Sequence, residues 1–79
     1  MNPRIKKAKL NQDYTFSIIF ANDEKGIFDI KPYLEIGSFK DFKDFEKLRK
    51  FRIVDGVITW YNELDIAPDT VYLKSEKQK

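Results

Sequence analysis

Residues 51–61 read FRIVDGVITWY, which places Asp55 and Gly56 between two runs rich in apolar and β-branched side chains. An Asp-Gly pair in that setting is a strong local signal for a β-hairpin with a two-residue turn. Such a turn also fixes which residues of the two strands face each other. The predicted pairs are Val54 with Val57, Ile53 with Ile58, Arg52 with Thr59 and Phe51 with Trp60.

Alternation sorts the side chains of this hairpin between two faces. The face predicted to point into the core carries Phe51, Ile53, Ile58 and Trp60. The opposite face carries Val54, Val57 and Tyr61, an apolar and aromatic patch of the kind that commonly contacts another protein. We therefore predict a protein interface at these three residues. The alternative is that a helix of the same chain, near residues 70–75, covers them.

The N-terminal part of the chain predicts a second hairpin. Residues 14–20 alternate, with Phe16, Ile18 and Phe20 on one face. A strand at residues 4–10 precedes them, and its apolar phase slips between Ile5 and Ala8, which indicates either a β-bulge or a strand that starts near Ala8. The returning strand is expected at residues 27–31, before Pro32, with Phe28 and Ile30 toward the core.

Two short helices are expected in the second half of the chain. Ser38, followed three residues later by Asp41, resembles a capping box and predicts a helix at residues 39–49. Its apolar side chains recur at every third residue, at Phe42, Phe45 and Leu48. Beyond the hairpin, Asp65 is predicted to cap a final helix whose first turn contains Pro68 and Asp69.

These elements predict the α+β class, with a small mixed or antiparallel sheet of about five strands in two hairpins and one or two short helices packed on one face. The 79 residues form one domain, 42% of them hydrophobic and 15% aromatic, which is sufficient for a compact core. We expect a single domain at residues 1–79, with an ordered core at 4–74 and a polar, frayed tail at 75–79.

The composition argues against most enzyme classes. The chain contains no cysteine and no histidine. A thiol nucleophile, a Ser-His-Asp triad and a zinc site of the usual Cys/His kind are therefore excluded. Histidine is also the side chain that most readily transfers protons at neutral pH. We predict a non-enzymatic protein that carries no cofactor and no metal.

The charge and the apolar runs bear on location. Fifteen basic and 13 acidic residues are interleaved along the chain and give a net charge of +2, which is typical of a soluble mixed surface. The longest apolar run, SIIFA at 17–21, is far too short to span a membrane. No secretory signal follows Met1, so the cytoplasm is the expected location.

Two other functions remain as alternatives. A nucleic-acid-binding accessory domain would use the densest basic cluster, Lys47, Arg49, Lys50 and Arg52, and a second cluster lies at Lys6, Lys7 and Lys9. A carboxylate-dependent enzyme, or a magnesium or calcium site, would use Glu63, Asp65 and Asp69. Against the second alternative, Asp65 and Asp69 are already explained as helix-start residues.

One further pattern extends over residues 5–73 and is carried by Phe20, Gly26, Phe28, Asp29, Gly37, Phe39, Trp60, Asp65, Pro68, Asp69 and Tyr72. In this pattern the chain resembles the bacterial family known as domain of unknown function 2442. The resemblance implies a small α+β fold and no known activity. Some relatives carry a helix-turn-helix domain, and some are encoded in toxin–antitoxin-like pairs, which implies a regulatory module. We predict an interaction module, regulatory or antitoxin-like, with a protein partner or self-association.

Overall fold

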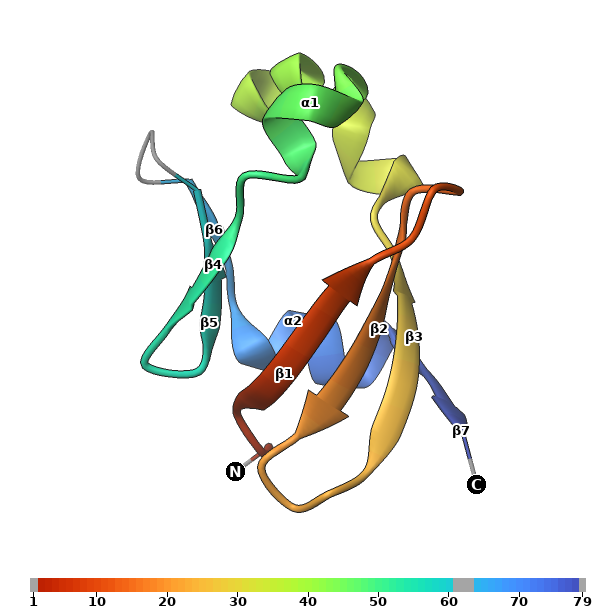
Figure 1. Ribbon diagram of the computed structural model, residues 1–79, viewed down its shortest axis with the longest axis vertical. Coiled ribbons are helices and arrows are strands. Elements are labelled where there is room, and N and C mark those ends of the chain that lie inside the picture. The colour runs from red at the N-terminus through yellow and green to blue at the C-terminus, as the bar shows by residue number, and fades with distance from the viewer. Residues whose placement is uncertain (1, 61–63, 79) are drawn as a thin grey trace.

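The structure is a computed structural model that describes residues 2–60 and 64–78. The described residues form two antiparallel sheets and several short helical turns, so the protein belongs to the α+β class (Figure 1). The strand order is β1-β2-β3-β7 in the larger sheet and β4-β5-β6 in the smaller one. The strands are β1 (Ile5–Leu10), β2 (Thr15–Phe20), β3 (Lys25–Asp29), β4 (Arg52–Val54), β5 (Val57–Thr59), β6 (Asp65–Ile66) and β7 (Glu76–Gln78). The expected single sheet of about five strands is therefore replaced by two sheets with seven strands among these residues.

The larger sheet contains the N-terminal hairpin that the alternation predicts. β1 pairs with β2, and the register shifts between Ile5 and Lys7, which confirms the bulge. β2 pairs with β3, with Phe16 opposite Phe28. Both rings are fully buried. β3 begins and ends two residues earlier than the sequence predicts, because Lys25 and Gly26 already belong to the ladder.

The expected frayed tail differs from the structure, since β7 pairs antiparallel with β3. Gly26 makes this approach feasible, because a Cβ atom at that position would lie only 3.0 Å from the Cβ atom of Ser75. The ammonium group of Lys77 lies 4.0 Å from the centre of the Tyr72 ring, which anchors β7 to the helix before it. The polar residues of β7 thus form a strand because they pair with the edge of β3.

The second hairpin has the register that the Asp-Gly turn predicts. The ladder between β4 and β5 pairs Val54 with Val57, Ile53 with Ile58 and Arg52 with Thr59. Asp55 and Gly56 have φ values of 51° and 79°, as a two-residue turn of this kind requires. The ladder ends at Arg52 and Thr59, so the expected Phe51–Trp60 pair does not form. The Trp60 N–H instead donates to the Leu64 carbonyl over 2.8 Å.

The core lies between the two sheets, and both hairpins contribute side chains to it. The buried apolar side chains are Ile5, Phe16, Ile18, Phe20, Phe28, Ile30, Leu34, Phe42, Leu48, Ile58, Trp60, Ile66 and Val71. Trp60 is 1% exposed, its ring stacks on Phe42 at 4.6 Å, and its indole N–H donates to the Leu48 carbonyl over 2.8 Å. The prediction that Trp60 faces the core is confirmed. Its partner in the prediction, Tyr61, lies outside the described residues.

The single helix predicted at 39–49 is wrong. Two 3₁₀ helices, η1 (Lys31–Glu35) and η2 (Gly37–Lys43), precede a one-turn helix α1 (Phe45–Leu48). Asp44 separates η2 from α1 with an extended backbone, and its carboxylate accepts a hydrogen bond from the Glu46 N–H over 3.0 Å. Asp44 is therefore the helix cap, and Ser38 caps nothing.

The cap predicted for the last helix is also wrong. Helix α2 (Pro68–Lys74) begins after Ala67, with no side-chain cap. Asp65 instead lies in β6, opposite Thr59, so its backbone is extended and committed to the sheet. Pro68 and Asp69 do occupy the first turn, as predicted, where proline needs no N–H partner and a carboxylate meets the positive end of the helix.

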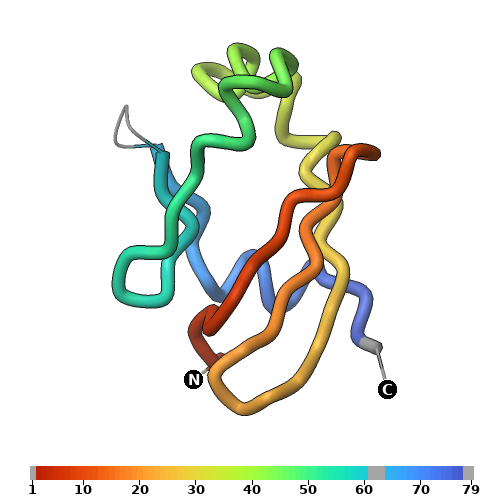
Figure 2. The backbone as a smooth tube through the Cα atoms, viewed as in Figure 1, coloured from red at the N-terminus to blue at the C-terminus, as the bar shows by residue number. Residues whose placement is uncertain are grey.

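The chain path explains how the two sheets come together. The η1, η2 and α1 turns cross one end of the molecule and connect β3 to β4, whereas α2 lies toward the other end and leads back to the larger sheet (Figure 2). The helices are thus divided between two places and do not pack on one face. Within the described ranges, no helix is long and apolar enough to cross a membrane.

Candidate interaction surface

The exposed side of the β4–β5 hairpin contains two of the three residues predicted to form a protein interface. Val54 is 45% exposed, and its cross-strand partner Val57 is half-buried. Ile58, one residue along from Val57, is fully buried. The two faces of the hairpin therefore differ as predicted. Tyr61, the third interface residue, lies outside the described residues.

The tip of this hairpin is fixed to the first strand. The Ile5 N–H donates to the Gly56 carbonyl over 3.1 Å, and the Arg4 guanidinium donates to the Asp55 carbonyl over 2.8 Å. A Cβ atom at Gly56 would lie 2.5 Å from the Cβ atom of Arg4, so the contact depends on glycine. A surface held in this way loses little conformational freedom when a partner binds.

Helix α2 does not cover Val54. The helix turns Val71 into the core, where its side chain is fully buried, and leaves Leu73 67% exposed. Val54 remains accessible on the other sheet. The alternative, in which the last helix covers the predicted interface residues, is therefore wrong for Val54. The exposed side of the hairpin at Val54 and Val57 is called the hairpin patch below.

The predicted basic cluster runs from α1 into β4, where its last member, Arg52, lies two residues before Val54. All four side chains, Lys47, Arg49, Lys50 and Arg52, are exposed. Arg49 is occupied by an ion pair with Glu46, at 2.9 Å. Among the described residues, Lys47, Lys50 and Arg52 have no ion-pair partner. Arg52 and Val54 point to the same side of β4, so the apolar patch has a basic border.

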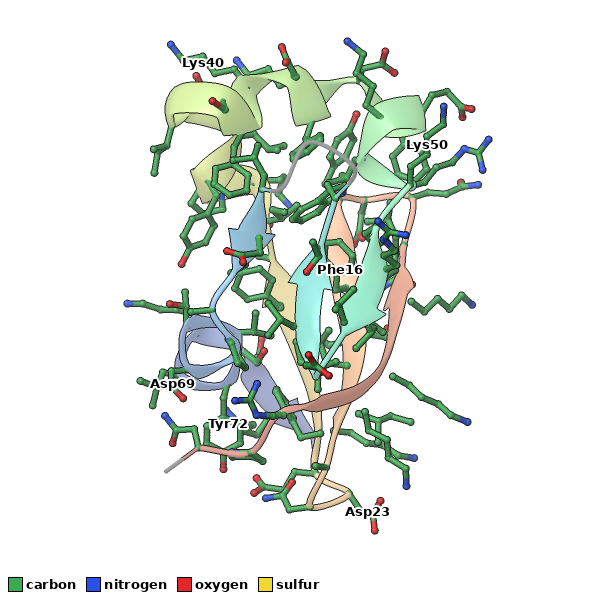
Figure 3. The ribbon with its side chains drawn as sticks, turned by 90° about the vertical axis from the view of Figure 1, so that its left-hand side faces the viewer. Phe16, Asp23, Lys40, Lys50, Asp69 and Tyr72 are labelled. Atoms are coloured by element: carbon green, nitrogen blue, oxygen red, sulfur yellow. The ribbon has the colours of Figure 1, made fainter. Side chains whose placement is uncertain are left out.

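The predicted acidic cluster does not assemble in the described part of the chain. Asp65 lies in β6 and Asp69 in α2, while Glu63 is not among the described residues. No three acidic side chains in residues 2–60 and 64–78 form a group that could hold a metal ion. Figure 3 shows Asp69 and Lys50 toward opposite ends of the molecule, so the basic cluster is also distant from this acid.

Among the residues that the structure describes, Asp13 and Tyr72 have displaced pKa values, and both groups make local hydrogen bonds. The Thr15 hydroxyl donates to Asp13 over 2.6 Å and holds the pKa of that carboxyl below its ordinary value of 3.8. The Tyr72 hydroxyl donates to Glu24 over 2.8 Å, which raises the pKa of the tyrosine above 10.0. Neither group lies on the hairpin patch, and neither pKa moves toward neutrality, as a general acid or base would require.

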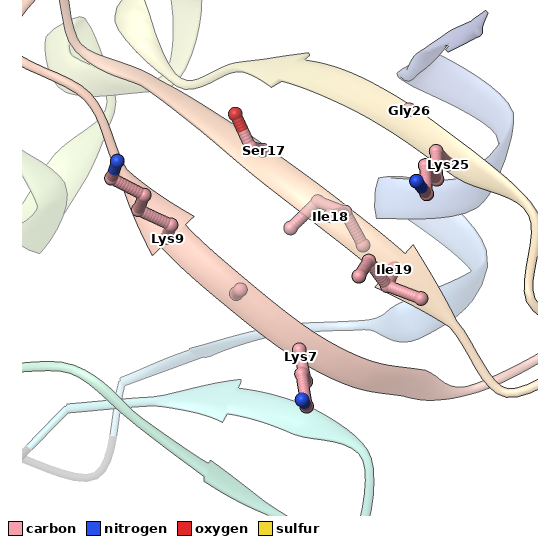
Figure 4. A pocket seen from close by; sticks show the side chains of 8 residues that line it. Lys7, Lys9, Ser17, Ile18, Ile19, Lys25 and Gly26 are labelled. Atoms are coloured by element: carbon pink, nitrogen blue, oxygen red, sulfur yellow. The ribbon is translucent and has the colours of Figure 1, made fainter.

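A second surface was only partly visible in the sequence. Lys7 and Lys9 on β1 and Lys25 on β3 border a shallow depression of about 370 Å³ on the outer side of the larger sheet, with Ser17 and Ile19 on the strand between them (Figure 4). The run of lysines at residues 6–9 is evident in the sequence. Lys25 joins the group only through the register that pairs Lys7 with Ile19 and Ile19 with Lys25. Lys6 instead forms an ion pair with Asp23.

Together, these features define a small α+β domain with two antiparallel sheets, an exposed hairpin patch and a lysine-rich outer sheet face. The model of the family described as protein of unknown function DUF2442 matches residues 5–77. The chain belongs to this family. Among curated proteins and among solved structures, no match to the chain was found.

Proposed function

We propose that this protein is a non-enzymatic interaction module that binds a protein partner through the exposed side of its β4–β5 hairpin. The observation that carries the proposal is the 45% exposure of Val54 on a hairpin whose tip is fixed by Arg4 and Ile5. A pre-formed apolar patch of this kind favours association, because its burial removes apolar surface from water without an ordering step.

The basic border suggests the chemistry of the partner. Arg52, two residues before Val54 on the same side of β4, is exposed, and Lys47 and Lys50 continue the basic cluster toward α1; all three are unpaired within the described residues. Carboxylates around an apolar centre on the partner would complement them and orient the encounter. We therefore expect the partner to present an apolar residue flanked by acids. A regulatory or antitoxin-like role, as the family resemblance implies, and the cytoplasmic location expected from the sequence are part of the same proposal.

The nucleic-acid alternative uses the same basic residues. Their free charges could neutralise phosphates, but Asp41, Asp44 and Glu46 lie on the adjoining helical turns and would oppose a phosphate chain. A protein partner fits the mixed apolar and basic surface better. Salt dependence distinguishes the two, since affinity for nucleic acid falls steeply as the salt concentration rises.

The decisive experiment compares two substitutions of exposed apolar residues. The tagged protein and its Val54→Lys and Leu73→Lys variants are used to capture partners from an extract of the native host, and the captured protein is then titrated in purified form. Both changes place a lysine at an exposed position in a stable fold, but only Val54 belongs to the patch. We expect Val54→Lys to weaken binding at least tenfold, or about 1.4 kcal/mol, and Leu73→Lys to leave it unchanged.

Equal binding by Val54→Lys and the unchanged protein would contradict the proposed interface. Recovery of the protein with nucleic acid alone, with binding that collapses at high salt, would favour the alternative function. Urea unfolding of both variants serves as the control that neither has lost its fold.

A further inference from the structure

The outer side of the larger sheet carries a row of side chains that is positive at one edge and negative at the other. The registers align Lys9 on β1 with Ser17 on β2, Ser17 with Ile27 on β3, and Ile27 with Glu76 on β7. Residues directly opposite each other in a sheet point to the same side. Lys9 and Glu76 are both exposed, and neither has an ion-pair partner among the described residues.

Lys9 and Glu76 cannot neutralise each other within one molecule. Two strands separate β1 from β7, and neighbouring strands are about 4.8 Å apart, so the two backbones lie roughly 14 Å from each other. Between them, Ile19 and Ile27 are only half-buried, because no element of the described chain closes over this side of the sheet. The face therefore combines an accessible aliphatic centre with one row, from Lys9 to Glu76, whose ends carry opposite charges, while the neighbouring row carries Lys7 on β1 and Lys25 on β3.

Twofold symmetry makes this pattern complementary to itself. Consider two copies placed face to face and related by a twofold axis that runs parallel to the strands. β1 of one copy then lies over β7 of the other, and each row of side chains lies over the same row of the other copy. Lys9 of each copy then faces Glu76 of the other, and the aliphatic centres meet. An axis perpendicular to the strands would place β1 over β1, with lysine against lysine, so electrostatic repulsion excludes that arrangement.

We propose that the outer faces of two larger sheets pack together in this way and form a symmetric homodimer. The occupant of the face is a second copy of this chain, because one row supplies both halves of the ion pair, as a closed isologous interface requires. The aliphatic stems of Lys7 and Lys25 contribute contact area beside Ile19 and Ile27. The hairpin patch at Val54 belongs to the other sheet and stays free for a different partner.

The dimer is expected to be weak and reversible. Four strands of about five residues cover roughly 19 by 17 Å, which is well below the 800 Å² or so that each partner buries in a typical stable complex. Association should therefore be visible at high micromolar concentration and absent from dilute solution.

A charge-swap experiment tests the proposal. Sedimentation equilibrium from micromolar to millimolar concentration is measured for the unchanged protein, Lys9→Glu, Glu76→Lys and the double variant. Each single change converts two attractions into two repulsions, so we expect it to raise the dimer dissociation constant about tenfold or more. The double change restores the pairs in reversed order and should return the dissociation constant to within about twofold of the original.

Two control variants complete the experiment. Lys40→Glu, on η2, makes the same change in net charge away from this face and should leave the association unchanged. Because Glu76→Lys could loosen β7, Ile27→Lys provides a second test at a position in the middle of the sheet, and it should also abolish the dimer while circular dichroism shows a folded monomer.

A protein that stays monomeric at millimolar concentration would overturn the proposal. So would an association that Lys40→Glu weakens as much as Lys9→Glu, or a folded double variant that fails to recover it. Binding of an acidic peptide or an oligonucleotide to this face of a strictly monomeric protein would assign the surface to a different occupant and equally refute the dimer.

Discussion

The β4–β5 hairpin and the segment at residues 37–48 are both short stretches with apolar side chains in the core, yet the sequence predicts the residue pairs of the first and the wrong helix for the second. In the hairpin, Asp55 and Gly56 adopt the positive φ values of a two-residue turn, and this turn determines the register between β4 and β5. In the helical segment, the apolar side chains recur every third residue, and that spacing does not specify one kind of helix. A turn with a backbone requirement is thus more informative than a periodicity alone.

The three-residue spacing is explained by the structure. On an α-helix, Phe39, Phe42 and Phe45 would drift around the surface, whereas a 3₁₀ helix has three residues per turn and stacks positions i and i+3. The Phe39 and Phe42 rings lie 6.0 Å apart in η2, and both contact Trp60. Phe45 packs on Tyr14 instead, at 5.4 Å, because Asp44 redirects the chain before α1.

Removal of Trp60 should have the largest effect, because this residue joins the two regions. Its ring stacks on Phe42 and its N–H bonds to the Leu48 carbonyl. We expect Trp60→Ala to reduce the free energy of unfolding by about 3–5 kcal/mol, measured by urea denaturation. Trp60→Phe keeps one aromatic ring but loses the N–H donor and part of the buried ring, so its cost should be smaller, about 1–3 kcal/mol. Equal losses for the two variants would show that the stacking contributes nothing.

Substitution of the turn glycine should have the next largest effect. Gly56→Ala combines a φ of 79° with a Cβ atom 2.5 Å from that of Arg4, and we expect a loss of about 2–3 kcal/mol in unfolding free energy. Gly37→Ala is the matched control in the helical segment. Its φ is 48°, but a Cβ atom there meets no atom of the described residues within 4 Å, so the loss should be about 1 kcal/mol. Indistinguishable losses would mean that the Arg4 contact does not hold the hairpin tip.

The smallest effect is expected for removal of a helix cap, and it distinguishes the observed cap, Asp44, from the predicted one, Ser38. Asp44→Ala removes the carboxylate that accepts from the Glu46 N–H and should cost about 1 kcal/mol. Ser38→Ala, at the position where the sequence predicts the cap, should change the unfolding free energy by less than about 0.5 kcal/mol. A larger loss for Ser38→Ala than for Asp44→Ala in the same urea titrations would contradict this assignment and support the continuous helix at 39–49.

Local patterns explain which parts of the fold were predictable. The alternation in β2 and the Asp-Gly turn each act within a few residues, so the core positions of both hairpins follow from them. β7 has no apolar alternation and exists because β3 offers an edge beside Gly26. β6 is only two residues long and depends on β5. Such long-range pairings leave no periodic signal in the strand that completes them.

The two candidate surfaces also differ in how far the sequence predicts them. Val54 and Val57 were identified because a register calculated from the turn assigns each residue to a face. The row from Lys9 to Glu76 could not be identified, because its two charged ends are 67 positions apart in the sequence and meet in one sheet only when β7 pairs with β3. The chain contains 13 acidic and 15 basic residues, and only the complete register shows which of them share a face.

The central claim is that the Asp-Gly turn points Val54 toward solvent and Ile58 toward the core. Because the chain has no cysteine, single Val54→Cys and Ile58→Cys variants can be labelled with a thiol reagent in the native state. We expect Val54→Cys to react like a free thiol, and Ile58→Cys to react at least about a hundredfold more slowly, through transient opening alone. A protected thiol at 54 with a reactive one at 58 would mean a register slipped by one residue, and the proposed docking surface would then face inward.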